Sequence, residues 1–384
     1  MTDVLSDYER QLLARNDEVV SVLKTSSPQC DLSREPPREV WQAYVAAGLK
    51  GLLVSQAQGG CEASAAVMVR MSEALGAIDP IATLTFLPQE YCISALARYG
   101  HHAWHEEMLR VFIAGEKSTG FVLTEPDVGS DATAITTLAL ADTGGWRLNG
   151  TKAWVTNAPY IDEYFVFAQT EAGSGARGIA GFLVPRESAG VNISEPYELL
   201  GGHVGNICNV RFENVILASE RLIVPPGDGM RAALSAIDLA RINVAAMCCG
   251  ALATGLDIAL DYTTTRKAFG EVIANFQGLQ WQLAEVATDL HAAKLMSYEA
   301  ATLLDQQGRA STEAAHAKKF ATRAALKGLD ICMGQLGSNG LKRDTALPRL
   351  FEHVKIAHTL DGTTDIQNVV ISRALLAQYR DRLS

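Results

Sequence analysis

Three stretches of different hydrophobic periodicity follow one another along the chain. In the first, up to about residue 118, apolar positions recur at the spacing of amphipathic helices, as in Ala65 to Leu75 and Gln89 to Ala97. In the second, short β-rich runs alternate with turn residues. In the third, the helical period returns over longer segments. The pattern predicts three domains: α-helical over 1–118, β over 119–224 and an α-helical bundle over 225–384.

Prolines set the helix limits expected in the first domain. An amphipathic segment opens at Glu9 and should end near Ser26-Ser27-Pro28, because proline removes a hydrogen bond inside a helix. Pro36-Pro37 then precedes a second helical segment, from Glu39 to Ala47.

Turn signals separate the β-rich runs of the second domain. Asn149-Gly150 and Gly173-Ser174-Gly175 stand between runs such as Trp146-Arg147-Leu148 and Tyr164-Phe165-Val166-Phe167. Such spacing predicts a small antiparallel barrel or sandwich. The glycines match neither GxGxxG nor GxxxxGK followed by Ser or Thr, so no phosphate loop is expected.

Long helices are expected in the third domain, over roughly 229–264, 277–305 and 311–336, with a terminal one from 364. The second of these carries an apolar stripe typical of a helical bundle, formed by Leu283, Val286, Leu290, Ala293, Ser297, Ala300 and Leu304. Helices, then strands, then a four-helix bundle make an α+β arrangement without βαβ alternation.

Composition narrows the class of protein. The chain has 384 residues, 48% of them hydrophobic and 20% charged, which is typical of a soluble globular protein. A net charge of −10 argues against a nucleic-acid partner, whose phosphates require a basic face. The first residues lack the features of a signal peptide, and no apolar segment is uninterrupted for the length of a bilayer, so no membrane association is expected.

Cysteines and histidines give no sign of a metal site. The seven cysteines form no CxxC pair, and they indicate reduced thiols and a cytoplasmic location. His101, His102 and His105 could in principle gather a metal across one helical turn, but nothing in their spacing makes them converge. We favour a solvated surface helix there and predict no metal.

A carboxylate stands at a turn close to the C-terminus, in the stretch from Leu360 to Gln367. Gly362 permits a backbone turn, and Thr364 and Gln367 have the spacing of a capping box. Asp361 is then fixed just before a helix N-terminus, where the helix dipole favours its ionised form. It is either a general base or merely a helix cap, and this stretch alone leaves both open.

Three further segments are candidates for ligand contacts. Leu123 to Asp131 leaves a strand and enters a glycine-containing loop, and Trp154 and Thr156 share one face of the following strand. Arg266, at the end of a long helix, could meet a diphosphate bidentately or cap helix carbonyls. Each segment alone is also compatible with ordinary turns and packed strands.

Together these segments resemble the acyl-CoA dehydrogenase family of flavoproteins. The matching motifs are T-E-P-x-x-G-S-D from Thr124, W-x-T-N from Trp154, R-x-x-F-G from Arg266 and D-G-T from Asp361, and the resemblance covers essentially the whole chain. It implies a three-domain subunit, usually within a tetramer. It also implies FAD between the β domain and the bundle, with part of the site from a neighbouring subunit.

The resemblance assigns residues to the cofactor and to the substrate. Those implied to bind FAD are Phe121, Leu123, Thr124, Trp154, Thr156, Arg266, Phe269, Gln277 and Thr363. Thr156 would lie near the flavin N5 atom, and Arg266, Phe269 and Gln277 would act across the dimer. Residues implied to touch the substrate are Ser130, Asp238 and Arg241.

The family chemistry implied is α,β-dehydrogenation of an acyl thioester. A carboxylate removes the α proton while the β hydride passes to the flavin, and electrons leave through an electron-transfer flavoprotein or similar acceptor. Asp361 holds the position of the base, and Ala240 stands at the family's other base position, so no second acid competes. The thioester would be short or branched, carried by CoA or an acyl-carrier protein.

The chain departs from the family pattern at several positions. Asp361 stands where the family usually has Glu, which is longer by roughly 1.5 Å. Leu360 replaces a Tyr, Glu352-His353 replaces an Arg-Asp pair, and the loops at 201–206 and 334–338 are altered. Two alternatives therefore stay open: a flavin oxidase like the nitroalkane oxidases, which resemble this family and use Asp as base, or a non-catalytic binding relative.

Overall fold

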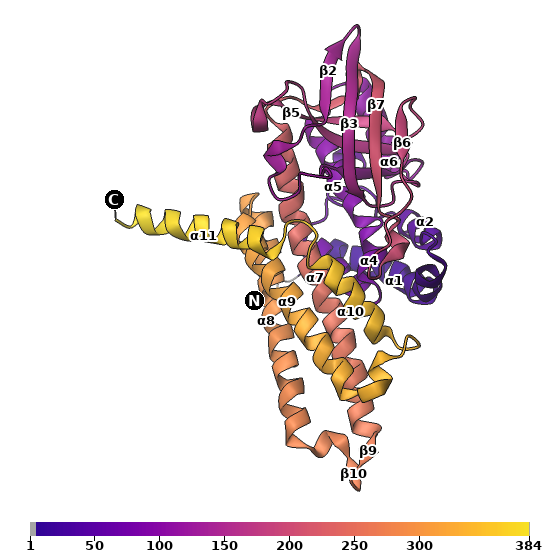
Figure 1. Cartoon of the computed structure of the whole chain (residues 1–384), viewed down its shortest axis with the longest axis vertical. Helices are drawn as coiled ribbons and strands as arrows, with labels where there is room; N and C mark the ends of the chain where they lie inside the picture. The colour runs from indigo at the N-terminus through magenta and orange to yellow at the C-terminus, as the bar shows by residue number, and fades with distance from the viewer. Residues whose placement is uncertain (1–4, 384) are drawn as a thin grey trace.

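A computed structural model describes residues 5–383, apart from the side chains at 31 and 32. Figure 1 shows the main β-sheet at one end of an elongated molecule, the long helices at the other, and the N-terminal helices beside the junction. The predicted α+β fold, with helical, β and helical parts in this order, is confirmed.

Six helices form the N-terminal part. They are α1 (Asp7–Ser33), α2 (Arg38–Ala46), α3 (Ala65–Gly76), α4 (Pro80–Leu84), α5 (Leu87–Tyr99) and α6 (Ala103–Ile113). The prediction that the first helix ends near Pro28 is wrong, since α1 continues to Ser33. Buried Leu23 and Ser27 anchor this part of α1, and the Ser27 hydroxyl donates to Asp79. Packing thus compensates for the hydrogen bond that the proline removes.

Eight strands form the sheet of the middle part: β1 (Thr119–Val122), β2 (Leu138–Asp142), β3 (Gly145–Val155), β4 (Glu163–Gln169), β5 (Ile179–Pro185), β6 (Val191–Ile193), β7 (Cys208–Ala218) and β8 (Leu222–Val224). Their order is β6-β7-β3-β2-β4-β5-β8, and β1 lies on β4. Most pairs are antiparallel, as predicted, but β1 and β2 run parallel to β4.

Asn149-Gly150 is not the predicted turn. It lies inside β3, where the register against β7 shifts between Leu148 and Gly150 and Gly150 has a φ of +147°. An added Cβ at Gly150 would stand 2.5 Å from the Thr137 hydroxyl, so the glycine permits the two chain segments to approach closely. Asn149 Oδ1 also accepts from the Asn214 N–H, which keeps β3 and β7 together across the irregularity.

The C-terminal part contains α7 (Gly229–Thr265), α8 (Gln277–Gln307), α9 (Ser311–Gln335), α10 (Ala346–Ala357) and α11 (Thr364–Asp381). A small hairpin of β9 (Lys267–Ala268) and β10 (Glu271–Val272) joins α7 to α8. The fourth bundle helix was misassigned. It is α10, which packs on α7 and α9, whereas the terminal α11 projects away from the body (Figure 1).

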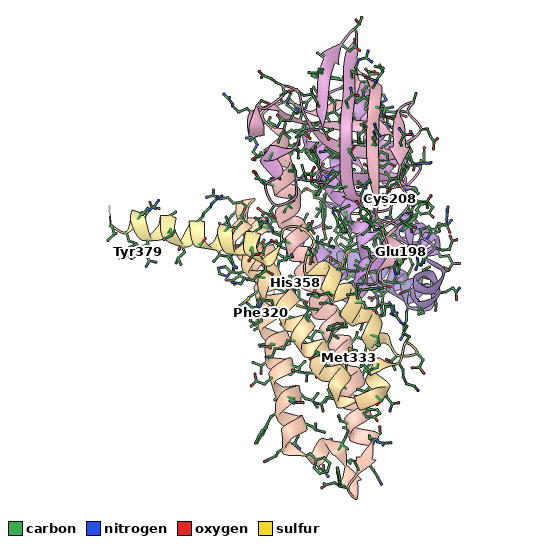
Figure 2. All side chains as sticks on the ribbon, in the orientation of Figure 1. Glu198, Cys208, Phe320, Met333, His358 and Tyr379 are labelled. Atoms are coloured by element: carbon green, nitrogen blue, oxygen red, sulfur yellow. The ribbon has the colours of Figure 1, made fainter. Side chains whose placement is uncertain are left out.

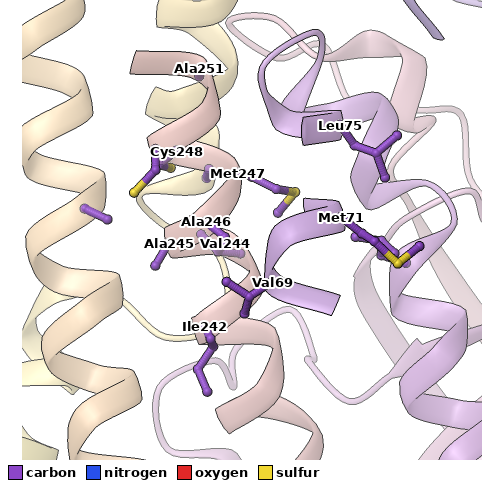
Figure 3. Close-up of a cluster of buried hydrophobic side chains, with 14 of the residues drawn as sticks. Val69, Met71, Leu75, Ile242, Val244, Ala245, Ala246, Met247, Cys248 and Ala251 are labelled. Carbon is purple, nitrogen blue, oxygen red and sulfur yellow. The ribbon is translucent and has the colours of Figure 1, made fainter. Parts of the chain in front are cut away.

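Close packing of α3 on α7 fixes the interior position of α7. Figure 3 shows Val69 of α3 facing α7 residues that include Ile242 and Val244, while Met71 and Leu75 point to the other side of α3. An added Cβ at Gly76 would lie 2.4 Å from the Met247 Cα, so the two backbones approach as only glycine permits. This contact places the α7 residues just before it at the junction of the three parts.

One helix, α7, is long and apolar enough to cross a bilayer by length and composition, but Arg241 and Asp257 interrupt it, so the expectation that no uninterrupted apolar segment is long enough is not contradicted. Within the part of the chain that the structure describes, 72% of its most apolar window is buried inside the protein. Core helices of soluble proteins share this property.

Candidate active site

The turn between α10 and α11 carries Asp361. Asp361 has a φ of +50° and Gly362 a φ of +92°, so two consecutive residues adopt left-handed backbone conformations. An added Cβ at Gly362 would lie 3.0 Å from Gln367 Nε2 and 3.4 Å from an Arg241 guanidinium nitrogen. The turn is therefore surrounded closely by side chains of α7 and α11.

Thr363 caps α11, and the predicted capping box at Thr364 and Gln367 is wrong. The Ile366 N–H donates to the Thr363 hydroxyl at 3.4 Å. The Thr364 hydroxyl is instead 3.1 Å from His358 Nε2, and the Gln367 amide donates to the Gly362 carbonyl at 2.9 Å. Tertiary contacts thus use the two side chains that the sequence pattern assigned to the cap.

Three helices supply donors to the backbone around Asp361. Arg241 Nε of α7 donates to the Asp361 carbonyl at 3.1 Å. Lys318 Nζ of α9 donates to the carbonyls of Gly362, at 2.6 Å, and His358, at 3.0 Å. Figure 2 labels His358 where α10 ends beside the start of α11. With Gln367 of α11, these donors hold both sides of the turn.

The Asp361 carboxylate itself is half-buried and accepts no hydrogen bond from any group among residues 5–383. Burial raises its pKa above the ordinary value, and the charges of Lys318 and Arg241 partly oppose that rise. Desolvation therefore outweighs the stabilisation of the ionised form that we expected from a helix N-terminus. Because Thr363 caps α11, the interpretation of Asp361 as a mere helix cap loses its support.

Half-buried Asp238 and buried Arg241 form a pair one turn apart on α7. An Arg241 guanidinium nitrogen lies 2.9 Å from Asp238 Oδ1, and the Ser311 hydroxyl donates to the same carboxylate. Burial raises the pKa of Asp238, although Ser311 and Arg241 oppose this. Arg241 thus bridges the Asp238 carboxylate and the Asp361 carbonyl. Its neighbour Ala240 is buried and carries no acid.

A second group of predicted residues gathers at the ends of β1 and β3. The Ala153 N–H donates to the Thr124 carbonyl at 2.9 Å, which joins the segment after β1 to β3. Lys152, fully buried, donates to the Leu123 carbonyl at 2.7 Å and lies 3.0 Å from Glu125 Oε1. Glu125 in turn accepts from the N–H groups of Thr136 and Thr137.

The Glu125–Lys152 pair is ionised in place. Burial alone would raise the pKa of Glu125, but the Lys152 ammonium and the hydrogen bonds from residues 136 and 137 lower it to about 2. Burial lowers the pKa of Lys152 to about 8, against the attraction of Glu125. The pair fixes the backbone on both sides of Thr124 and thereby the edge on which Trp154 lies.

Trp154 projects from a bulge at the end of β3. The register against β7 shifts between Lys152 and Val155, and Trp154 has a φ of +60° and is 54% exposed. Its indole lies against the Tyr197 ring, with centroids 4.7 Å apart. The hydroxyls of Thr124 and Thr156 have no hydrogen-bond partner in the described part of the chain. An exposed indole beside two free hydroxyls fits a planar, hydrogen-bonding cofactor such as FAD.

The predicted residues of the bundle lie apart from this edge. Arg266, Phe269 and Gln277 are exposed around the β9–β10 hairpin, at the end of the bundle opposite the sheet (Figure 1). Phe121 is half-buried, 5.1 Å from the Phe167 ring centroid, and Ser130 is exposed in the loop after β1. The expectation that Arg266, Phe269 and Gln277 act across a dimer stays a prediction.

Comparisons with known proteins match this arrangement. Models of the acyl-CoA dehydrogenase N-terminal, middle and C-terminal domains match residues 16–116, 120–215 and 227–376. The chain belongs to the acyl-CoA dehydrogenase family. It is an oxidoreductase of the class that acts on CH–CH groups.

Individual relatives share nearly the whole length of the chain. The 3-(aryl)acrylate reductase of Clostridium sporogenes is 31% identical over 91% of this chain and 93% of its own. The structure of butyryl-CoA dehydrogenase from Megasphaera elsdenii superposes with a TM-score of 0.93 at 26% identity, covering 98% of this chain and all of that one. A structure titled PigA with FAD and proline superposes with a TM-score of 0.91 at 25% identity, covering 98% and 99%. Structural relatives of this family member thus bind FAD.

Sequence reasoning missed Lys318, Gln367 and Tyr197 of this acyl-CoA dehydrogenase-like site. Lys318 lies on the apolar stripe of α9 between Ala314 and Ala321, and a lysine on a core face is a signal that could have been used. Gln367 stood in the motif but was assigned to a cap. No signal in the sequence indicated that Tyr197 would lie against Trp154.

The side chains of His102 and His105, near α6, form hydrogen bonds with backbone groups. His105 is buried, its Nδ1 accepts from the N–H groups of His101 and His102, and its Nε2 lies 2.7 Å from the Glu220 carbonyl. The expectation that this is a wholly solvated surface is therefore wrong for His105, because α6 packs that face on the β domain. Among the described residues, no group of three or more His, Cys, Asp or Glu could hold a metal.

Two departures from the family pattern also have structural partners. Glu352 forms an ion pair with Arg343 at 2.6 Å, and His353 lies 3.0 Å from the Asp79 carboxylate. An added Cβ at Gly201 would meet the Glu352 Cβ at 2.8 Å, so the altered 201–206 loop packs against α10. These residues are engaged in joining α10 to α4 and to that loop.

Two surface grooves lie elsewhere. One of about 510 Å³ runs between α8 and α9 and is lined by residues including Lys319 and Arg323. The other, of about 380 Å³, lies between Thr136 and Gly173 in the β domain. Neither is lined by a residue that we predicted for the site, and the contacts of the Asp361 turn are the better guide to it.

Proposed function

We propose that this protein catalyses the FAD-dependent α,β-dehydrogenation of a short or branched acyl thioester, with Asp361 as the base. The observation that supports this most directly is the Asp361 turn. Its backbone is held by donors from α7, α9 and α11, while its carboxylate is left without a hydrogen bond. A fixed, available carboxylate suits proton abstraction.

FAD would be held by Phe121, Leu123, Thr124, Trp154, Thr156 and Thr363 of one subunit and by Arg266, Phe269 and Gln277 of another. The cofactor, when bound, supplies the acceptor for the hydride that leaves the β carbon. The Glu125–Lys152 pair keeps Thr124 and Trp154 in place, since its contacts link the segment after β1 to β3.

The chain's own residues would handle the proton. Asp361 takes the α proton, and the raised pKa brings its carboxylate closer to the proton affinity that this step requires. Arg241 keeps Asp361 oriented through its carbonyl and is itself kept in place by Asp238. Ser130, Asp238 and Arg241 remain our predicted substrate contacts.

A second copy of the chain would complete the cofactor site. Arg266 and Phe269 lie at the far end of the bundle from Trp154, and Phe269 is 96% exposed. The projecting α11 exposes Leu375, Leu376 and Tyr379 as well, and Figure 2 shows Tyr379 far from the body. We therefore propose a homo-oligomer, a dimer or tetramer.

We also propose that an electron-transfer flavoprotein or similar acceptor takes the electrons from the reduced flavin. We further propose that the protein is cytoplasmic.

The proposed function is tested by looking for bound FAD and for a substrate that reduces it. The purified protein should be yellow and release FAD on denaturation, and an anaerobic panel of acyl thioesters should include one that bleaches the flavin and yields an enoyl thioester. Colourless protein that cannot be reconstituted with FAD would instead indicate a non-catalytic relative.

The shorter base supports one other candidate, a flavin oxidase like the nitroalkane oxidases. Asp361 is the relevant observation, because those enzymes resemble this family and use Asp. Flavin reduction by a nitroalkane and by no thioester would establish that function in place of the dehydrogenase.

A further inference from the structure

A lysine that neither family motif nor site prediction includes lies beneath the proposed base. Lys318 is 1% exposed, although it is a long charged side chain that proteins almost never bury without compensating contacts. An ammonium carries three donors, and two of them are directed at the His358 and Gly362 carbonyls. These carbonyls lie three residues before Asp361 and one residue after it.

We propose that Lys318 is a positioning residue for Asp361: its ammonium holds both sides of the turn and supplies, beside Arg241, a positive charge that faces the carboxylate. The inference rests on the proposed function, because it takes Asp361 as the base. Lys318 does not touch the carboxylate, since no ion pair joins the two side chains within the described residues. It acts through the backbone and through its charge.

Geometry supports the positioning role. Asp361 and Gly362 both have positive φ, and a non-glycine residue in that conformation carries backbone strain that surrounding contacts can offset. The Gly362 carbonyl accepts from Lys318 and from Gln367, at 2.6 and 2.9 Å, so two helices fix one peptide of the turn. Removing the ammonium takes away the donor to the His358 carbonyl and one of the two donors to the Gly362 carbonyl. The turn then loses its hydrogen bonds from Lys318 of α9.

Charge supports the electrostatic role. The groups that face Asp361 are Lys318 from α9, Arg241 from α7 and the Tyr91 hydroxyl from α5. Cys248 of α7 and His358 also lie near the lysine. Burial lowers the pKa of Lys318 to about 8, and the Asp361 charge opposes this, so the lysine is mostly protonated at neutral pH. The positive charge lowers the pKa of Asp361 relative to burial alone.

The test compares Lys318→Met with a matched control, Lys319→Met. Lys319 is the next residue of α9, and its side chain lines the groove between α8 and α9, away from the turn. Both substitutions remove one positive charge from the same helix. The readouts are the rate of substrate-driven flavin reduction against pH, and the Asp361 carboxyl band followed by difference infrared titration, assigned with Asp361→Asn.

In Lys318→Met we expect the acid limb of the rate profile and the Asp361 titration to move to higher pH by about one unit, as for loss of a nearby opposite charge. The plateau rate should fall by ~10-fold or more, because the turn loses its anchor. Lys319→Met should match the parent protein in the acid limb, the Asp361 titration and the plateau rate. A Lys318→Met protein with a lower melting temperature but unchanged acid limb and titration would overturn the proposal.

If Lys318→Met yields no folded protein, Lys318→Gln carries the same test, because it removes the charge and keeps an N–H donor on a somewhat shorter side chain. An unshifted Asp361 titration in Lys318→Gln would likewise overturn the proposal. The infrared titration needs neither substrate nor turnover. A shift seen there in a protein that no thioester reduces would therefore reject the proposed function and leave the Lys318–Asp361 link standing.

Discussion

Two turns of this chain have nearly the same backbone and opposite surroundings. Asp361-Gly362 has φ values of +50° and +92°, and Phe269-Gly270, in the β9–β10 hairpin, has +54° and +91°. Around Gly362 an added Cβ would meet Gln367, Ile366 and Arg241, whereas around Gly270 it would meet nothing within 4 Å. The first turn is thus enclosed by its own subunit, and the second stands in the open.

The comparison separates local conformation from function. An x-Gly pair with positive φ at both positions is a tight turn that the sequence can specify by itself. What makes one turn a candidate catalytic element is the set of buried donors around it, from Arg241, Lys318 and Gln367. The other turn has no such set among residues 5–383, and we expect a second subunit and the cofactor to surround it.

The largest effect should come from removing the proton acceptor of the enclosed turn. Asp361→Asn keeps the shape and most contacts of the side chain, so folding and FAD binding should survive. Substrate-driven flavin reduction, followed by stopped-flow absorbance, should fall by ~10²-fold or more, the range for loss of a general base. Reduction at the parental rate would show that Asp361 is not the base.

The next largest effect should come from a substitution that distinguishes the two turns only by how closely their surroundings pack. Gly362→Ala and Gly270→Ala introduce the same strain at the same φ, of order 1–3 kcal/mol. Only at Gly362 would the methyl group meet Gln367 and Arg241, so that variant should also displace Asp361 and lose ~10- to 100-fold in flavin reduction. The measurement is the rate of flavin reduction in both variants. An equal fall in that rate for Gly362→Ala and Gly270→Ala would contradict the difference that we infer between the two turns.

A smaller effect is expected at the open turn. Phe269→Ala removes a side chain that is 96% exposed, so the far-UV spectrum of the chain should be unchanged. If Phe269 contacts FAD across a dimer, the variant should release FAD several-fold more readily, measured as FAD fluorescence in the filtrate on dilution. Unchanged retention of FAD would indicate that this turn stays open in the assembly.

The smallest effect concerns stability. Burial raises the folded-state pKa of Asp361, so its ionised form is disfavoured in the folded state. Stability falls as the pH rises from the ordinary pKa of the carboxyl group through the raised one. Asp361→Asn should therefore melt about 1–3 °C higher than the parent at pH 7. The two should converge below pH 4, as differential scanning calorimetry would show.

Much of the fold could be predicted from periodicity. The apolar stripe predicted for 277–305 is buried in α8 for every member from Leu283 to Ala300, because a 3.6-residue period places these side chains on one face. Where the prediction failed, a tertiary contact outweighed a local rule. Pro28 lies inside α1 because Ser27 and Leu23 are anchored, and Thr364 contacts His358 while Thr363 caps the helix.

The sequence by itself determined the order of helical and β parts, the motifs that mark the family, and the one acid, Asp361, at the position of the base. Only the tertiary structure decided that α10 completes the bundle while α11 projects from it, since the sequence pattern assigned that place to the terminal helix. It alone also showed that the Asp361 turn is held from α7, α9 and α11. The reason is physical: periodicity and turn chemistry act over a few residues, whereas Lys318 meets Gly362 from 44 residues away in the chain.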